Sequence, residues 1–226
     1  MTPYYADDSV TLYHGDCREV TEWLAADVLV TDPPYGRGWR QGRSKARGLN
    51  SDAHEGITGD ADTTTRDVAL GIWGSRPGVM FGDLMLPPPA GCKQVLVYLK
   101  PSNAGTRGAM AGWRRDAEAI YLIGNWPSDL RATRSSVVAT RAPSQGNPSS
   151  PQGLYGHPHA KPLDVMSALI AVTDGLVADP FTGSGSTLVA AKRMGRRAVG
   201  VEIEERYCEV AASRLSQEVL NFEVVS

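Results

Sequence analysis

The chain of 226 residues has only three cysteines and no pair of them at metal-ligand spacing. Cys17, Cys92 and Cys208 are widely separated, so the sequence predicts reduced thiols in a cytoplasmic protein and no zinc site. No apolar run approaches the roughly 18 residues that span a membrane, and the first residues form no basic, apolar leader. A membrane-spanning protein and a disulfide-stapled secreted domain are therefore both disfavoured.

An excess of either charge is also missing, because the net charge is −2. The length predicts a single domain over residues 1–226 with a full α/β core. The distribution of charge is uneven: a basic stretch without acids follows Gly36 and contains Arg37, Arg40, Arg43, Lys45 and Arg47. This stretch is either a solvated surface loop or a contact with DNA phosphates.

The five residues from Thr31 to Tyr35 form the most informative turn of the first half. They follow residues 27–30, a short β-branched run that reads as a buried strand. Two consecutive prolines, Pro33 and Pro34, then forbid continued strand pairing and helix, so the chain must turn at the carboxyl end of the strand. In an open α/β sheet ligands bind at that end.

The residue types in this turn suit the capture of an amine. The Asp32 carboxylate and the Pro33 carbonyl oxygen are acceptors, and an exocyclic amine on a base has two N–H donors to give them. The Tyr35 ring offers a face on which an unstacked base can lie, a contact of about 1–3 kcal/mol per base. The alternative is an ordinary strand-ending turn, since Asp-Pro and Pro-Pro are common breakers.

Apolar periodicity predicts alternating strands and helices. We expect strands at 9–13, 27–30, 78–81, 94–99, 117–123, 175–178 and 198–201, and helices around 20–24, 62–73, 163–170, 188–194 and 207–215. The first strand, helix and second strand predict a βαβ unit. Residues 36–60 are expected to form a mobile loop, and no element is predicted for 125–156.

A second turn has the layout of a nucleotide site. The strand at 175–178 ends in Asp179, a glycine turn and a helix follow, and the next strand ends at Glu202, nineteen positions after Gly183. Strand, glycine turn, helix and acid at this distance favour a nucleotide-binding unit, in which the acid accepts from ribose hydroxyls. Leu188 stands where a dinucleotide fingerprint needs its third glycine, which disfavours a nucleotide-dependent oxidoreductase and leaves room for a nucleoside cofactor.

Three segments together resemble a known family: Asp-Pro-Pro-Tyr at 32–35, His-Pro-x-x-Lys-Pro at 157–162 and Asp-Pro-Phe-x-Gly-Ser-Gly-Ser-Thr at 179–187. They are similar to DNA amino-methyltransferases that use S-adenosylmethionine, in the motif order of the β class and of compact phage and prophage members. The resemblance implies a Rossmann-like class I methyltransferase sheet, mostly parallel with an antiparallel strand, helices on both faces and a circularly permuted motif order. The C-terminal helix should then end near the N-terminus.

The resemblance also assigns expected roles. Asp32, Pro33, Pro34 and Tyr35 would form the catalytic turn. The implied S-adenosylmethionine ligands are Asp16 at the adenine amine, Phe181 at the adenine or methionine region, Gly183 and Gly185 by close backbone approach, Ser186 and Thr187 at the carboxylate, Glu202 at the ribose and Lys161 at the methionine end. Asp179 is expected to shape this turn, with some cofactor contact. No metal is implied, because His157 and His159 lack partners.

The implied activity is methyl transfer to N6 of a flipped adenine in double-stranded DNA, in a bacterial or phage-infected cell. An aspartate at position 32 favours adenine, and N4-cytosine methylation and a catalytically idle nucleic-acid-binding subunit remain alternatives. Because the basic stretch adjoins the proposed base pocket, we expect it to bind DNA through Arg37, Trp39, Arg40, Arg43, Lys45 and Arg47. A short target-recognition insert at 125–156, a homodimer and a restriction partner are left open.

Overall fold

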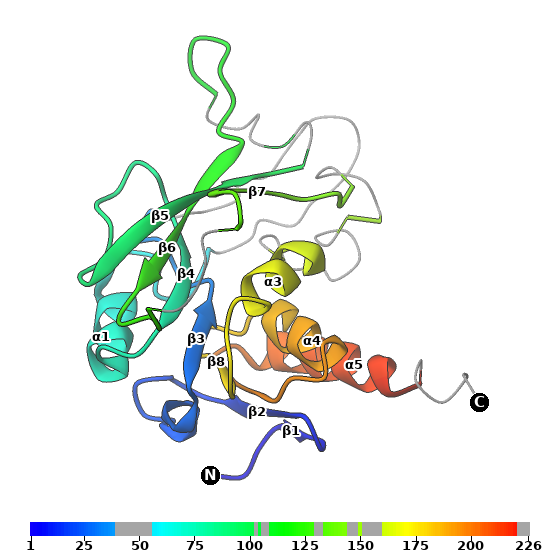
Figure 1. Cartoon of the computed structure of the whole chain (residues 1–226). Coiled ribbons are helices and arrows are strands. Elements are labelled where there is room, and N and C mark those ends of the chain that lie inside the picture. Colours follow the sequence, from blue (N-terminus) through cyan, green and yellow to red (C-terminus); the bar gives the residue numbers. More distant parts are fainter. Residues whose placement is uncertain are drawn as a thin grey trace.

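Short β-branched and aromatic runs form the strands of one sheet (Figure 1). The computed structural model describes residues 1–38, 56–101, 104, 109–128, 133–143, 149–150 and 160–220, with only the backbone for 218–220. The strands are β1 (Tyr5–Ala6), β2 (Val10–His14), β3 (Val28–Thr31), β4 (Gly78–Gly82), β5 (Cys92–Leu99), β6 (Ala117–Ile123), β7 (Val137–Ala139), β8 (Val177–Asp179) and β9 (Ala198–Glu202). Their spatial order among the described residues is β1-β2-β9-β8-β3-β4-β6-β5-β7.

Strand direction in this sheet brings distant parts of the sequence to one edge. The five neighbours β2, β9, β8, β3 and β4 run parallel. Strand β6 runs antiparallel to both β4 and β5, and β1 runs antiparallel to β2. The predicted sheet, mostly parallel with antiparallel pairing, is confirmed. The carboxyl ends of the parallel strands and the amino end of β6 consequently lie at the same edge.

Helices cover both faces of the sheet because side chains alternate along the strands. Val28 and Val30 of β3 point to the face covered by α3 (Leu163–Ile170), α4 (Ser186–Arg193) and α5 (Glu205–Leu220). Leu29 points to the other face, where it joins the cluster formed with η1 (Glu22–Ala25) and α1 (Thr64–Trp73). On that second face Trp23 and Trp73 stack with their ring centroids 5.7 Å apart.

Two local predictions are wrong. The helix expected around residues 20–24 is a single 3₁₀ turn, η1, because few residues separate the turn after β2 from the start of β3. The expected βαβ unit fails as well, since β9 and β8 lie between β2 and β3. Strand β7, in the stretch for which no element was predicted, pairs in parallel with β5 at the sheet edge. The other predicted strands and helices are confirmed within a few residues.

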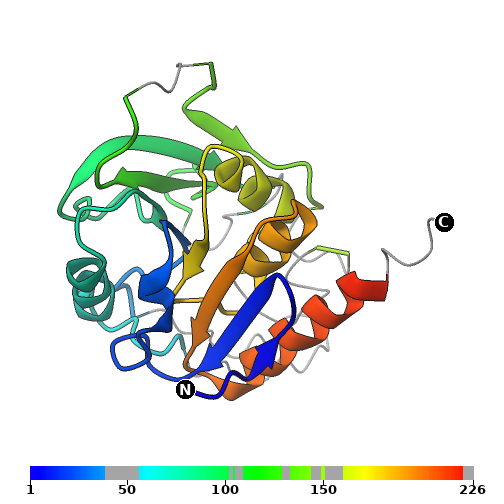
Figure 2. The same cartoon turned by 60° about the horizontal axis from the view of Figure 1, so that its bottom comes forward.

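The permuted order places the last strand and the last helix beside the N-terminal segment that forms β1 and β2 (Figure 2). The first long strand, β2, pairs with the last strand, β9, in register from Val10 with Ala198 to His14 with Glu202. Lys192 of α4 donates to Asp7 at 2.5 Å and to the Leu215 carbonyl oxygen at 2.9 Å. The C-terminal helix is therefore joined to the N-terminal segment through one buried ammonium group.

Within the described ranges, no helix is both long and apolar enough to cross a bilayer. All three cysteines carry free thiols. The same part of the chain contains no cluster of three or more metal-ligating side chains.

Candidate active site

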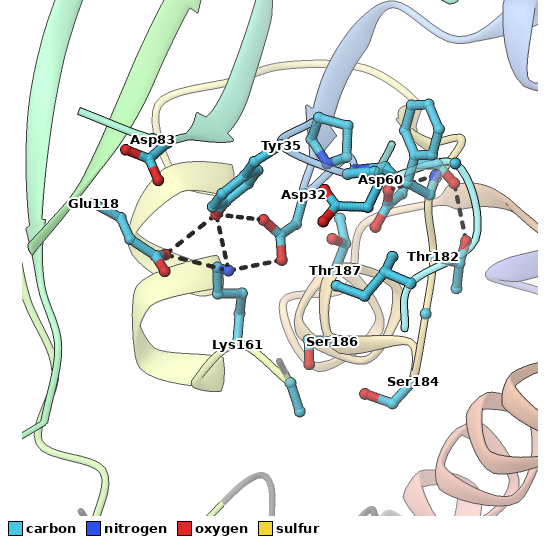
Figure 3. A pocket seen from close by; sticks show the side chains of 18 of the residues that line it. Asp32, Tyr35, Asp60, Asp83, Glu118, Lys161, Thr182, Ser184, Ser186 and Thr187 are labelled. Atoms are coloured by element: carbon cyan, nitrogen blue, oxygen red, sulfur yellow. Dashed lines mark hydrogen bonds and ion pairs between the residues drawn. The ribbon is translucent and has the colours of Figure 1, made fainter. Parts of the chain in front are cut away.

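Four acidic residues lie at the carboxyl ends of four neighbouring parallel strands. Asp179 and Glu202 are the last residues of β8 and β9, Asp32 directly follows β3, and Asp16 comes two residues after β2. All four line one cavity of about 1030 Å³. Figure 3 shows Asp32 in this cavity beside Tyr35 and Lys161. We call the part formed by Asp32, Tyr35, Glu118 and Lys161 the Tyr35 end, and the part formed by Asp179, Phe181, Gly183 and Glu202 the Phe181 end.

Most of the candidate residues from the sequence meet in this cavity. Its lining includes Asp16, Asp32, Pro33, Pro34, Tyr35, Arg37, Lys161, Asp179, Phe181, Gly183, Ser186, Thr187 and Glu202. Gly185 lies outside the lining. Trp39, Arg40, Arg43, Lys45 and Arg47 fall outside the described residues, as do His157 and His159.

Five polar groups form a continuous network at the Tyr35 end. Lys161 Nζ lies 2.7 Å from Asp32 Oδ2, 3.2 Å from the Tyr35 hydroxyl and 3.3 Å from Glu118 Oε2. The Tyr35 hydroxyl lies 2.9 Å from Asp32 Oδ1 and 3.2 Å from Glu118 Oε2. Lys100 Nζ holds the other Glu118 oxygen at 2.8 Å. Both oxygens of Asp32 therefore have a donor in this structure.

In this network burial raises the pKa of the carboxyl groups, whereas their ion pairs with lysine lower it. Burial raises the pKa of the Asp32 carboxyl, and Lys161 acts against that rise. Burial would also raise the pKa of Glu118, but the ammonium groups of Lys161 and Lys100 prevail and lower it to about 2. The two carboxylates in turn raise the pKa of Lys161 in spite of its burial. Glu118 and Lys161 are therefore held as ions.

Backbone contacts to Asp60 fix the turn that carries Tyr35. Asp60 is buried and accepts hydrogen bonds from the backbone N–H of Gly36 at 2.8 Å and of Arg37 at 3.3 Å. Gly36 has φ +79°, and a Cβ there would lie 2.8 Å from the Asp62 backbone, so glycine is required. The Arg37 guanidinium forms an ion pair with Asp83, which follows β4. This residue of the predicted DNA-binding stretch thus has an acidic partner inside the protein.

At the Phe181 end the acids are held by backbone amides and a hydroxyl. Thr31 donates its hydroxyl to Asp179 Oδ1 at 2.6 Å, and the Phe181 N–H donates to the same oxygen at 3.1 Å. Glu202 accepts from the Gly183 N–H at 2.7 Å and from the Glu204 N–H at 2.8 Å. Each carboxyl group thereby holds part of the turn that surrounds it.

The acids at this end ionise with more difficulty than ordinary carboxyl groups. Burial raises the pKa of Asp179 to about 6, and its hydroxyl and amide donors offset only part of that rise. Burial likewise raises the pKa of Glu202 to about 7, against the two backbone N–H donors. A ligand that donates hydrogen bonds to Glu202 would favour its charged form.

Gly185 has a packing role, although the sequence suggested close approach to a ligand. It precedes α4 with φ +83°, and a Cβ at this position would lie 2.9 Å from the Cβ of Ala211 in α5. The neighbouring Ser184 is fixed from the same helix, because the Arg214 guanidinium donates to its carbonyl oxygen. Helix α5 therefore supports the glycine turn from outside the cavity.

Asp16 lines the cavity and is paired with Arg18, a residue to which the sequence alone assigned no role. The Arg18 side chain donates through Nε to Asp16 Oδ1 at 2.9 Å and to Oδ2 at 3.1 Å. The Arg18 guanidinium lowers the pKa of the Asp16 carboxyl. Asp16 is accordingly an ionised acceptor at the opening of the cavity.

Sequence reasoning missed Glu118, Lys100 and Asp60. Glu118 falls within the strand expected at 117–123, and Lys100 directly follows the strand expected at 94–99. The signal that could have found Glu118 is the antiparallel direction of β6, which brings the start of that strand to the edge where the parallel strands end. Asp60 lacked a local signal, because its partners Gly36 and Arg37 are remote in sequence.

Several known proteins are similar to this chain in sequence along most of its length. A family model described as DNA methylase matches residues 92–213. The type II methyltransferase M.ScaI of Streptomyces caespitosus is 42% identical, over 96% of this chain and 84% of its own. The type II methyltransferase M2.MboI of Moraxella bovis is 36% identical, over 95% and 91%. The putative methylase YubD of Escherichia coli (strain K12) is 29% identical, over 89% and 88%.

Solved structures share the fold at lower identity. The M1.HpyAVI–SAM complex superposes with a TM-score of 0.60 at 20% identity, over 91% of this chain and 98% of that one. The PvuII DNA methyltransferase, described as cytosine-N4-specific, gives a TM-score of 0.60 at 18% identity, over 97% and 93%.

Proposed function

The chain belongs to the DNA methylase family of S-adenosylmethionine-dependent amino-methyltransferases, and from this premise we propose that it methylates N6 of a flipped adenine in double-stranded DNA. The observation that carries the proposal is the shared cavity. The amine-accepting turn with Asp32 and the nucleotide turn with Phe181 come from separate parts of the sequence and line the same space.

The residues at the Phe181 end suit a nucleoside cofactor. Glu202 is buried, faces the cavity and can accept from two ribose hydroxyls. Gly183, at φ +52°, has no side chain to occupy the space beside it. We propose that Phe181 packs on the cofactor, that Ser186 and Thr187 bind its carboxylate at the start of α4, and that Asp16 accepts from its adenine amine. S-adenosylmethionine supplies a methyl group on a positively charged sulfur.

The contribution of the Tyr35 end is positioning. Asp32 and the Pro33 carbonyl oxygen would accept the two hydrogens of the base amine at about 2.7–3.2 Å. Holding both hydrogens favours a pyramidal nitrogen, whose lone pair then points away from these acceptors. The gain is proximity and fixed electrostatics. Stacking on Tyr35 would offset part of the few kcal/mol that base flipping costs.

The rim of the cavity suits a nucleic-acid backbone. Lys100, Arg114 and Arg115 line the cavity, and the adjoining turn presents Trp113 with 81% of its surface exposed. We propose that this rim contacts the duplex together with the basic stretch Arg37–Arg47. A Trp113→Ala variant should weaken DNA binding several-fold in a fluorescence titration, and unchanged affinity would remove Trp113 from the interface.

Three further points of the proposal concern the whole chain. We propose one methyltransferase domain over residues 1–226, because all described strands belong to one sheet. Residues 125–156 remain the proposed site of target recognition. A homodimer also remains a prediction.

The experiment that tests the function is transfer of labelled methyl groups from S-adenosylmethionine to unmethylated DNA, followed by nucleoside analysis. We expect N6-methyladenine with the wild type and only background label with Asp32→Ala. Equal label with both proteins would remove Asp32 from the site. N4-methylcytosine as the product would establish the alternative substrate, and absence of transfer would support an idle DNA-binding subunit.

A further inference from the structure

The two donors that hold Asp32 also reach a second carboxylate. Lys161 Nζ lies 2.7 Å from Asp32 and 3.3 Å from Glu118, and the Tyr35 hydroxyl lies 2.9 Å from Asp32 and 3.2 Å from Glu118. A phenol has one hydrogen, so Tyr35 can donate to only one of the two acids at a time. Both donors lie closer to Asp32 than to Glu118, and Figure 3 shows the contacts of each donor with both acids.

This arrangement conflicts with the proposed role of Asp32. A carboxylate oxygen can accept more than one hydrogen bond, but Asp32 Oδ2 already accepts from an ammonium at 2.7 Å and is a weaker acceptor for a base amine than an unpaired carboxylate oxygen. The ammonium of Lys161 occupies the kind of position that the amine would take. Strong binding of the base amine therefore favours a shift of Lys161 toward its other acceptor, since a buried ammonium has to stay paired.

Glu118 has the properties of that acceptor. It lies at the start of β6 with its side chain 12% exposed, and Lys100 anchors its Oε1 at 2.8 Å. Its Oε2 faces both Lys161 and Tyr35. A shift of well under 1 Å would turn its longer contacts into ordinary hydrogen bonds. Lys161 also lies 4.8 Å from the Phe81 ring centroid and 5.6 Å from that of Tyr35, which keeps its cationic head near Glu118 throughout the shift.

We propose that Glu118 is a positioning residue that takes Lys161 and the Tyr35 hydroxyl from Asp32 when the target amine arrives. The inference rests on the proposed function, because it assumes that Asp32 receives the amine. The exchange breaks no covalent bond, and the charges of Asp32, Glu118, Lys161 and Lys100 stay the same. Asp32 is occupied while the site is empty and becomes an acceptor when the base enters.

The first test needs neither DNA nor activity. In a crystal structure of Asp32→Asn, which has no negative charge at position 32, Lys161 Nζ should move to within about 3 Å of Glu118 Oε2. The Tyr35 hydroxyl should turn to the same oxygen. Lys161 remaining on residue 32 would overturn the inference without affecting the proposed function.

The second test measures rate and binding separately. Glu118→Gln keeps the shape of the side chain but cannot accept an ammonium as an ion pair, so Lys161 should remain on Asp32. We expect the single-turnover rate of methyl transfer, measured where the variant is folded, to fall about tenfold or more, while the dissociation constant of S-adenosylmethionine stays close to that of the wild type. Glu209→Gln, which removes an exposed carboxylate from α5, is the matched control and should keep the wild-type rate.

A double substitution separates this role from a merely structural one. In a Lys161→Met background Asp32 no longer has to release an ammonium, so adding Glu118→Gln should cost much less than it does in the wild type. Equal losses in both backgrounds or an unchanged rate in Glu118→Gln would each overturn the inference. An inactive wild type would instead contradict the proposed function.

Discussion

Glu118 at the Tyr35 end and Glu202 at the Phe181 end of the cavity are both buried, but their pKa values shift in opposite directions. At the Tyr35 end Glu118 lies between two lysines, and its pKa falls to about 2. At the Phe181 end Glu202 accepts from two backbone N–H groups, and burial raises its pKa to about 7. One cavity thus contains an acid that is always ionised and an acid that is near its midpoint at neutral pH.

The difference lies in the charge of the donors. Two ammonium groups add full opposite charges and outweigh desolvation at Glu118, whereas a single ammonium does not outweigh it at Asp32 and a backbone N–H adds only a dipole. The Tyr35 end therefore has fixed charges that are available for orienting an amine. The Phe181 end keeps its acids partly protonated until a ligand supplies hydroxyl donors. The two ends should consequently respond differently to substitution and to pH.

The largest expected effect is a loss of methyl transfer without a loss of cofactor binding. Asp32→Asn replaces an acceptor by an amide that also donates, so the single-turnover rate of methyl transfer should fall about 10²–10³-fold. The dissociation constant of S-adenosylmethionine, measured by calorimetry, should change less than about threefold. A parallel loss of cofactor affinity would show that the two ends are not separate in function.

The second-largest expected effect is on cofactor binding, and it depends on pH. Removing the charge in Glu202→Gln should weaken S-adenosylmethionine binding about 10–100-fold, because charge-assisted hydrogen bonds of about 1.5–3 kcal/mol are lost. In the wild type the ribose hydroxyls would donate to the ionised form, so binding releases the proton from a group with a pKa of about 7. Affinity should therefore rise as the pH increases through 7 and level off above it.

Glu202→Gln also serves as the control for the pH dependence of cofactor affinity. The affinity of Glu202→Gln should be nearly flat with pH near neutrality, apart from the smaller contribution of Asp179, whose pKa is about 6. A wild-type affinity that stays constant or falls as the pH rises through 7 would contradict the role given to Glu202.

The smallest expected effect concerns stability at the Phe181 end. Gly185→Ala places a Cβ 2.9 Å from Ala211 at φ +83°, so it should lower the free energy of unfolding through both clash and backbone strain. Gly195→Ala has a similar φ of +66° but meets no atom within 4 Å, so it shows strain alone. We expect Gly185→Ala to cost about 1–3 kcal/mol more than Gly195→Ala in urea unfolding. Equal costs would mean that α5 does not support the turn.

Most strands along the chain and the two turns at Asp32 and Asp179 could be predicted from the sequence, because they depend on local signals. Pro33 and Pro34 stop one strand, and the glycines after Asp179 open a helix at a distance from Glu202 that is typical of nucleotide sites. The same local signals gave a wrong prediction around residues 20–24, where a helix was expected and only the 3₁₀ turn η1 forms. Too few residues remain between the flanking elements for a longer helix.

The rest of the site depends on contacts that no local pattern encodes. Glu118 enters it through the antiparallel pairing of β6 with β4, and Lys161 reaches Asp32 across 129 positions of sequence. The Tyr35 hydroxyl was missed for the same reason: the sequence identified its ring, but its partner Glu118 is 83 positions away. Short motifs therefore identified Asp32 as a candidate, and only the fold identified the groups that contact it.

The most direct test of the shared cavity is a crystal structure of the chain with S-adenosylmethionine bound. We expect the ribose hydroxyls on Glu202, the adenosine against Phe181 and the sulfur-bound methyl group facing Asp32 across the cavity. A cofactor bound elsewhere, or one whose methyl group faces away from Asp32, would contradict the proposal that the Tyr35 end and the Phe181 end serve one reaction.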